Sequence, residues 1–458
     1  MQMRTTTSLV AFAVAAGWAL PTHAQTADAA AMQRELAEMR AQMQAMAQRI
    51  NTLEAQLETT QAQAAAANTA ATNAVAAATD AKENPVAAIA WKGAPVIEGK
   101  GGWSFKPRGR LNYDAGFVNA PDSTGRSDGF GSEARRARLG VEGDIPGGFG
   151  YKFEIDVAGN EVEVTDAILT YEDAGAKVSI GQHNTFQGLE ELTSSRFTSM
   201  IERAAFTDAF GFERRVGASL EYAGGNLLVQ GGLFTDNMAD LSNKSWSADG
   251  RVVVMPTMGD AQLHLGGSVH YAELNDASDT VRYRQRPLVH FTSERFVNTG
   301  NLEADSEFGL GLEAAAITGP FHAAAEGFWQ KVGRPTGLAD PTFFGGYAEV
   351  GMFLTPGDTR GYKKGTFDRV KPESPVGEGG IGAIQVNLRY DYLDLNDAGI
   401  FGGKQNGYLV SLIWTPTDYT RFLMNYGRLE YDDAVYPTAS DDTSYSVDAF
   451  GVRAQVDF

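Results

Sequence analysis

The sequence lacks three features that would each point to a common class of protein. It contains no cysteine, which excludes a disulfide-stapled scaffold, a Cys-ligated zinc site and a thiol nucleophile. It has no basic excess, because 57 Asp and Glu outnumber 38 Lys and Arg and give a formal net charge of −19. A nucleic-acid-binding protein would present a concentrated basic face instead. After the N-terminal segment it has no run of about 18 apolar residues, so no transmembrane helix is expected there.

Motifs of the common enzyme classes are also missing from the 458 residues. There is no G-x-S-x-G, no H-E-x-x-H and no P-loop pattern. His264 and His270 share one strand parity, but six residues along a strand span about 20 Å, too far to share a metal ion. We therefore expect a protein that is not an enzyme and that has no cofactor or metal site.

The first 24 residues have the features of a secretory signal peptide. Arg4 precedes an apolar run from Leu9 to Leu20, and Thr22-His23-Ala24 fits a small-x-small cleavage site. The alternative is a buried N-terminal helix. A cleaved signal would place the rest of the chain outside the cytoplasm.

Residues 25–60 are predicted to form an α-helical coiled coil in the periplasm. Apolar residues recur with the 4-3 spacing of a heptad seam at Met32, Leu36, Met39, Met43, Met46, Ile50, Leu53 and Leu57. The alternative is a single amphipathic helix packed on its own domain. Self-association is favoured because a short isolated helix is marginally stable, although the seam does not distinguish a dimer from a trimer. Residues 61–102 are interpreted as a spacer, frayed helix at first, with a boundary at Pro85.

From residue 103 to 458 the hydrophobic period changes to two. Tyr151, Phe153 and Ile155, for example, alternate with Lys152 and Glu154, as in a strand with one apolar and one polar face. About sixteen such runs are predicted. They begin near Arg108, Arg135, Phe149, Glu163, Ala176, Arg214, Gly225, Gly250, Ala261, Ser306, Pro320, Phe344, Ile381, Lys404, Tyr419 and Ser444.

Short turns and long loops alternate between these strands. This pattern is typical of an outer-membrane barrel, with short turns on the periplasmic rim. The connection at 356–380 departs from it, because it is long yet should be periplasmic. The alternative is a soluble all-β sandwich or propeller. Aromatic residues near the strand ends favour the membrane form. The predicted fold is therefore an all-β, antiparallel transmembrane β-barrel of about 16 strands, with the N-terminal coiled coil in the periplasm.

Strand parity places a row of cations in the lumen. Arg108, Arg110, Arg136, Arg138 and Lys152 are expected to face inward from three adjacent strands. Guanidinium groups present forked donors that match phosphate and carboxylate oxygens, and a narrow pore concentrates their field. The alternative is a structural network, in which these cations pair with the inward carboxylates Glu142, Glu154 and Asp156.

Two connections are candidate parts of the pore. The loop at about 184–213 is expected to fold into the lumen as a constriction, with Glu190, Glu191, Ser194, Ser195, Arg196, Glu202 and Arg203. The alternative is a surface loop that contacts neighbours. The connection at 356–380 could form a basic rim at the periplasmic mouth, or a solvated loop, with Arg360, Lys363, Lys364, Arg369 and Lys371.

Several ordered stretches carry a family resemblance over roughly residues 96–458. They are Ser104 to Leu111, Arg135-Arg136-Ala137, Gly188-Leu189-Glu190, Thr193 to Arg196, Met200 to Arg203, Phe353-Leu354-Thr355, Gly365 to Pro372 and Val452 to Phe458. With these stretches the chain resembles the phosphate-selective porin O and P family. The resemblance implies a sixteen-stranded trimer in which an arginine ladder leads to a tight anion site above periplasmic lysines.

The resemblance also implies roles for individual residues. The ladder would include Arg110, Arg135 and Arg136, although parity places Arg135 outward or in the loop. Other matching positions are Lys152, Ser194 and Arg203 in the lumen and constriction, Arg196 in the loop, and Lys363 or Lys364 with Lys371 in the periplasmic cluster. The sequence departs from the family at Glu191, where the selective members carry a Lys, and at Thr165-Asp166, where they carry an acidic pair.

The predicted function is passive diffusion of small anions, phosphate or polyphosphate first, through an outer-membrane channel. The expected partners are outer-membrane lipids, the anions themselves and two further copies of the chain in a homotrimer, and no nucleic acid. Two alternatives stay open. Because Glu191 changes the local charge by two units, the pore could be weakly selective or serve another solute. The protein could also have a structural role in the envelope, with the coiled coil contacting the cell wall.

Overall fold

The computed structural model describes residues 26–83, 87–126, 129–159, 161–240, 245–275 and 280–458. The predicted signal peptide at 1–24 lies outside the described residues. The chain divides into two compact units, Met1–Pro85 and Val86–Phe458.

The described residues of the first unit form the helix α1 (Thr26–Glu83). Its seam residues from Leu36 to Leu57 are all exposed on the single chain. The helix continues past residue 60 through the stretch interpreted as a spacer, because that stretch is rich in Ala and has no Gly or Pro before Pro85. Within the described residues, no helix is both long and apolar enough to cross a membrane.

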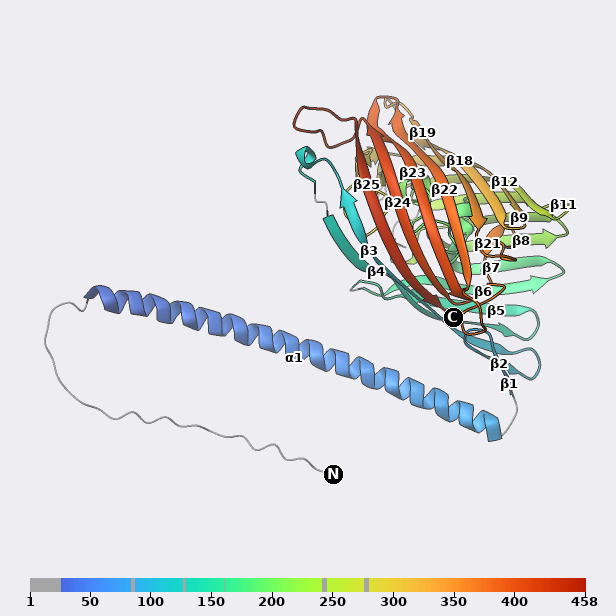
Figure 1. The fold of residues 1–458 in the computed structure, drawn as a ribbon, viewed down its shortest axis with the longest axis horizontal. Helices are drawn as coiled ribbons and strands as arrows, with labels where there is room; N and C mark the ends of the chain where they lie inside the picture. The colour runs from blue at the N-terminus through green and yellow to red at the C-terminus, as the bar shows by residue number, and fades with distance from the viewer. Residues whose placement is uncertain (1–25, 84–86, 127–128, 160, 241–244, 276–279) are drawn as a thin grey trace. The chain divides into compact units, whose positions relative to one another are not determined.

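The second unit is a closed antiparallel barrel of 16 strands within the described residues, as predicted from the sequence (Figure 1). Neighbouring strands pair in chain order, and β25 pairs with β3 to close the ring, with Asp457 opposite Arg110. The strands are β3 (Ser104–Asn119), β4 (Gly129–Ile145), β5 (Phe149–Asp156), β6 (Glu163–Asp173), β7 (Ala176–Asn184), β8 (Arg214–Gly224), β9 (Leu227–Phe234), β10 (Trp246–Val254), β12 (Ala261–Glu273), β17 (Ser306–Thr318), β18 (Phe321–Gly333), β19 (Thr342–Phe353), β22 (Ala383–Asp397), β23 (Ile400–Thr417), β24 (Thr420–Asp432) and β25 (Tyr445–Asp457).

The two faces of the wall follow from side-chain alternation. On β3, Leu111, Tyr113 and Phe117 are exposed on the outside, whereas Asn112 and Asp114 are buried on the inside. An outward apolar face suits lipid, and closure leaves no unpaired strand edge in the bilayer.

Shorter elements lie before the first barrel strand and in the connections between the barrel strands. The hairpin of β1 (Ala87–Trp91) and β2 (Pro95–Gly99) joins the start of β3, within the range interpreted as a spacer. The connections contain α2 (Leu189–Leu192), α3 (Ala205–Ala209), η1 (Asp122–Thr124), η2 (Met238–Asp240), β11 (Thr257–Met258), β13 (Thr280–Val281), β14 (Arg284–Gln285), β15 (Val297–Asn298), β16 (Leu302–Glu303), β20 (Gly361–Lys363) and β21 (Thr366–Asp368).

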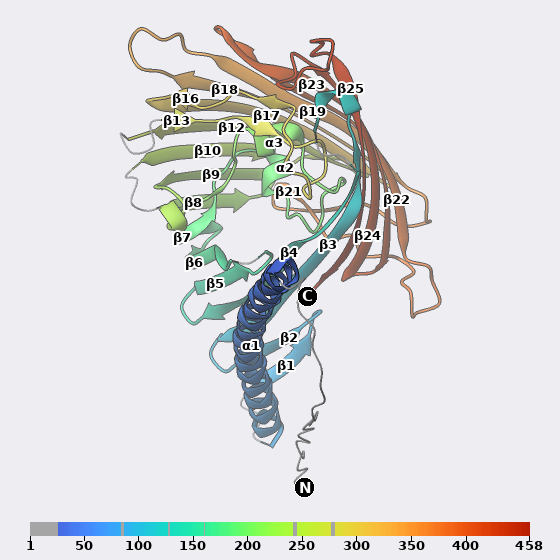
Figure 2. The ribbon, with the colours of Figure 1, turned by 90° about the vertical axis from the view of Figure 1, so that its left-hand side faces the viewer.

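The apolar core lies inside the barrel, between the wall and the connections that fold into it. Met200, Ile201 and Phe206 of the loop at 185–213 are almost fully buried in one cluster with Phe328 and Tyr347 of the wall. Figure 2 shows α2, α3 and β21 within the ring of strands. The loop therefore lies inside the barrel and not on its outer surface.

Candidate functional site

The loop at 185–213 is attached to the wall at the N-termini of its two short helices. The backbone N–H groups of Leu189 and Glu190 donate to the carboxylate of Glu326 at 2.8 and 2.6 Å. The N–H of Ala205 donates to the carboxylate of Asp391 at 3.0 and 3.2 Å. Free N–H groups at a helix N-terminus attract an anion, so each buried carboxylate fixes one end of the loop.

The irregular backbone between the helices is held by donors from strand β24 and from the connection at 356–380. Arg421 donates to the carbonyls of Arg196 and Thr198, and Arg360 donates to that of Phe197. Buried carbonyls outside regular structure need such partners. These arginines therefore support the loop and do not line the open lumen.

Arg203, predicted for the constriction, also holds the loop together. Its Nε donates to the carbonyl of Glu190 at 3.0 Å, and one terminal nitrogen donates to those of Glu191 and Thr193 at 2.9 Å each. Its Nε also lies 3.4 Å from Oε2 of Glu191. Burial raises the pKa of the Glu191 carboxyl, and the guanidinium of Arg203 opposes this shift.

A β-bulge decides the position of Arg135. Asn112 is opposite Arg136 but Tyr113 is opposite Ala134, so Arg135 is the extra residue of β4. Its guanidinium donates to both oxygens of the Glu202 carboxylate, at 2.9 and 3.1 Å. The parity prediction of an outward or loop position for Arg135 was wrong, because the bulge breaks the alternation. Arg135 instead contacts the loop at 185–213 through Glu202.

Glu202 is the acidic centre of this contact. It also accepts a hydrogen bond from Arg453 at 2.8 Å, and Arg453 forms a bidentate pair with Asp114. Burial alone would raise the pKa of Glu202, but Arg135, Arg136 and Arg453 outweigh it and hold that pKa well below its usual range.

Two cavities flank the loop inside the barrel. The long-loop cavity, about 260 Å³, includes Gln285, Arg286 and His290 from the long connection at 274–305. The short-turn cavity, about 300 Å³, includes Lys177 and Glu221 close to the short turns. Four residues line both cavities and so lie between them. They are Arg136, Arg138, Arg203 and Arg214.

The two cavities differ in charge. Among the described residues, six Arg and five Asp or Glu line the long-loop cavity, so its charge nearly cancels. Nine Lys or Arg and three Asp or Glu line the short-turn cavity. Its cations include Arg108, Arg110, Lys152 and Arg196, all predicted for the anion pathway or the constriction, and Ser194 and Ser195 also line it.

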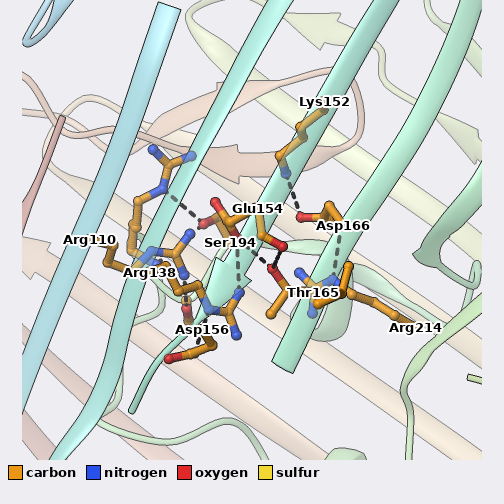
Figure 3. Close-up of polar contacts among 12 residues, drawn as sticks. Arg110, Arg138, Lys152, Glu154, Asp156, Thr165, Asp166, Ser194 and Arg214 are labelled. Carbon is orange, nitrogen blue, oxygen red and sulfur yellow. Dashed lines mark hydrogen bonds and ion pairs between the residues drawn. The ribbon is translucent and has the colours of Figure 1, made fainter. Parts of the chain in front are cut away.

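Several of these cations are neutralised by neighbours, as the structural alternative required. Arg138 pairs with Glu154 at 3.3 Å and Asp156 at 2.8 Å. Lys152 and Arg214 converge on Asp166 at 2.6 and 3.0 Å (Figure 3). Arg108 pairs with Glu142, and Arg196 pairs with Asp457 at 3.3 Å and donates to Ser194 Oγ.

Arg110 and Arg136 differ from these paired cations. Arg136 is only 6% exposed, and within the described part of the chain it forms no hydrogen bond and no ion pair, although the Glu202 carboxylate acts on its charge at longer range. Arg110 donates to Ser195 Oγ at 2.6 Å, and no ion pair is found for it among the described residues. Both guanidinium groups therefore keep donors available for an anion.

The basic connection at 356–380 partly enters the lumen. Gly365 accepts from Arg251 at 2.8 Å, and the N–H of Phe367 donates to Thr193 Oγ1 of the constriction loop at 3.2 Å. Lys363, Lys364 and Lys371 remain exposed, with Lys364 3.9 Å from Glu172, and do not line either cavity.

Sequence reasoning missed Arg214 and Lys177. Lys177 has the same inward parity as Ser179, so strict alternation along Ala176–Asn184 could have found it. Arg214 is the first residue of β8 and is followed by Arg215. Alternation alone does not decide which of the two faces the passage.

Comparisons with known proteins identify the family. The family model for phosphate-selective porin O and P matches residues 105–458. A protein of Caulobacter vibrioides is 48% identical over 383 residues, covering 81% of this chain and 77% of that protein. OmpT, an outer-membrane protein of Vibrio cholerae, is similar in structure, with a TM-score of 0.49, 12% identity and coverage of 79% and 100%. The outer-membrane channel DcaP of Acinetobacter baumannii gives a TM-score of 0.47, 15% identity and coverage of 79% and 99%. The chain thus belongs to the phosphate-selective porin O and P family and is an outer-membrane porin.

Proposed function

We propose that this porin lets small anions, phosphate or polyphosphate first, diffuse passively across the outer membrane. The observation that carries the proposal is the pair of guanidinium groups at Arg110 and Arg136, which form no direct ion pair in the described lumen. A buried guanidinium without a direct ion-pair partner is costly, and a transient anion would offset that cost. No energy source is needed, because the gradient drives the flux.

The proposed path connects the two cavities. An anion would leave the nearly neutral long-loop cavity, pass Arg136, Arg138 and Arg203, which line both cavities, and reach the cationic short-turn cavity. There Nη1 of Arg110 lies 2.6 Å from Oγ of Ser195, and the two groups can replace part of the hydration shell of the anion. Forked guanidinium donors suit the tetrahedral oxygens of phosphate. Lys363, Lys364 and Lys371 would collect anions at the periplasmic mouth, where their exposure leaves them solvated.

Glu191 supports the alternative of a weakly selective pore or of another solute. Its carboxylate lines the long-loop cavity and offsets Arg203. The acidic residues of that cavity would then oppose the entry of multiply charged anions.

The test is the conductance of purified protein in planar bilayers. Under a KCl gradient we expect a reversal potential of anion-selective sign, and phosphate should block the chloride current. Arg136→Ala should weaken both effects. Arg428→Ala is the matched control, because Arg428 is exposed on the outside of the barrel and pairs with Asp448. A cation-selective wild-type pore, or equal effects of the two variants, would reject the proposal.

We also propose that the exposed seam of α1 joins copies of the chain, with a homotrimer as the expected state and contact with the cell wall as a further possibility for the helix. The evidence is the row of exposed Met, Leu and Ile side chains from Leu36 to Leu57. Deleting residues 25–84 without loss of trimers or of envelope integrity would reject this role.

A further inference from the structure

The hairpin β1–β2 extends the sheet beyond the barrel. Ile89 is opposite Ile97, and Ile97 is opposite Phe105 at the start of β3. Directly opposed residues of antiparallel strands project to the same side. The three strands therefore share one face, which also carries Trp91 and, beside Gly99, Trp103.

This shared face is apolar and exposed. Trp91 is 75% exposed and Trp103 is 53% exposed, and Ile89, Ile97 and Phe105 are exposed as well. We call these five side chains the tryptophan face. Contiguous exposed apolar patches on a protein usually mark a contact with another apolar surface.

The other face of the hairpin already has its packing partner. Ala94 and Val96 are buried, and the turn at Gly93 lies so close to the ring of Tyr419 that an added Cβ would fall 2.4 Å from Cε1. The hairpin is thus fixed on the short-turn end of the barrel. Its exposed face is held in place by this packing.

The tryptophan face continues the lipid-facing surface of the barrel. Phe105 has the same parity on β3 as Leu111 and Tyr113, whose side chains project outward. Figures 1 and 2 show the hairpin beside the start of β3. Indole rings favour the boundary between hydrocarbon and headgroups, where the ring is apolar and its N–H is hydrated.

Charge at the turns agrees with a lipid surface. Lys92 and Lys100 lie in the two turns that bound β2, and both are exposed. Glu98 projects to the opposite side, with Val96. Cations beside an apolar patch are attracted to anionic phospholipid headgroups.

We propose that the tryptophan face lies in the headgroup region of the inner leaflet of the outer membrane and binds anionic phospholipids. The hairpin then anchors the chain to the membrane at the point where the segment containing α1 leads into the first barrel strand. This inference does not depend on which solute the pore conducts. A second copy of the chain on the same face is the competing occupant.

Fluorescence quenching in vesicles tests the proposal. The full chain carries Trp18→Phe, Trp246→Phe, Trp329→Phe and Trp414→Phe, so that Trp91 and Trp103 are the fluorophores. It is reconstituted in phosphatidylcholine–phosphatidylglycerol vesicles whose acyl chains are brominated near the headgroup or near the tail end. We expect shallow bromines to quench at least about twofold more than deep ones, as for an interfacial indole. Aqueous acrylamide should quench weakly.

Two controls calibrate this readout. A chain that keeps only Trp329, which is outward on the barrel wall, reports a lipid-facing indole. A chain with all six native tryptophans changed to Phe and Ser440→Trp in the exposed loop after β24 reports an aqueous one. Acrylamide quenching of Trp91 and Trp103 equal to that of the Ser440→Trp chain, with no bromine effect, would overturn the proposal.

Further variants separate lipid from protein contact. Lys92→Glu with Lys100→Glu should reduce shallow quenching in vesicles that contain phosphatidylglycerol and leave it unchanged in pure phosphatidylcholine. Trp91→Cys tests for a second copy, because an intersubunit disulfide at that position together with absent bromine quenching would assign the face to a subunit contact. Such a result would reject the lipid proposal.

Discussion

The two cavities of the lumen share four arginines, yet they differ in what those arginines face. In the long-loop cavity nearly every cation has a carboxylate nearby, whereas in the short-turn cavity cations outnumber carboxylates threefold. Arg138 belongs to both cavities and is paired twice, while Arg136 beside it is not paired within the described chain. The comparison teaches that the number of lumenal arginines overestimates the positive charge available to bind an anion. The relevant number is that of the arginines without a direct ion pair.

The largest effect on the block of the chloride current by phosphate should come from removing Arg110 and Arg136 together. Arg110→Gln with Arg136→Gln removes both guanidinium forks while leaving the ion pairs of Arg138 and Lys152 intact. A hydrogen bond to a charged group contributes about 1.5–3 kcal/mol. Losing one such bond at each of the two residues gives about 3–6 kcal/mol, so block by phosphate should weaken by about 10²–10⁴-fold. Phosphate titration of the chloride current measures the change. An unchanged block would place the anion site elsewhere.

The next largest effect should come from a paired arginine, and it should appear in stability. Arg453→Met leaves the buried carboxylates of Asp114 and Glu202 without their shared partner. Breaking such a buried pair costs about 3–5 kcal/mol. Denaturant unfolding from vesicles should show this loss, whereas Arg136→Met should show none. Equal losses for the two variants would erase the distinction between paired and unpaired cations.

A smaller effect should follow from Glu191→Gln. The change frees the guanidinium of Arg203, which is 3.4 Å from the Glu191 carboxylate, without removing its contacts to the loop carbonyls. The permeability ratio of chloride to potassium should rise by about threefold, as for a weak, partly solvated pair. Glu221→Gln is the control, because Glu221 lines only the short-turn cavity and accepts from Gln230. A fall in the ratio for Glu191→Gln would contradict the assignment.

The same carboxyl predicts a pH dependence of selectivity. Because burial raises the pKa of Glu191, the group becomes neutral at a higher pH than an ordinary Glu does as the solution is acidified. Neutralisation leaves Arg203 uncompensated, so anion selectivity should increase on acidification. Reversal potentials in KCl without phosphate measure this, since phosphate itself titrates near neutrality. The step should disappear in Glu191→Gln, and its persistence there would assign it to another group.

Features of this molecule that depend on residues close together in the sequence could be predicted, and features that depend on residues far apart could not. The strands follow from local alternation, so every predicted start lies within six residues of an observed one, and the inward position of Arg110 follows with them. Arg135 was misplaced because a bulge shifts parity without any local signal. Pairing was also unpredictable. Whether Arg138 or Arg136 meets a carboxylate depends on interstrand register and on the path of a loop that returns 67 residues later to bring Glu202 to Arg135.

The smallest effect on anion conductance should come from the exposed lysines, because they lie outside both cavities. Lys363, Lys364 and Lys371 carry charge near the lumen but do not line either cavity. Exposed charges are screened beyond about 8–10 Å at physiological salt, so they can raise the local anion concentration without forming a binding site. Changing all three to Ala should lower anion conductance by less than about twofold at low salt and have no effect in 1 M KCl. The phosphate concentration for half-maximal block should stay the same. A large change in that concentration would mean that these three lysines reach an anion bound at Arg110. The binding site would then extend beyond the two cavities.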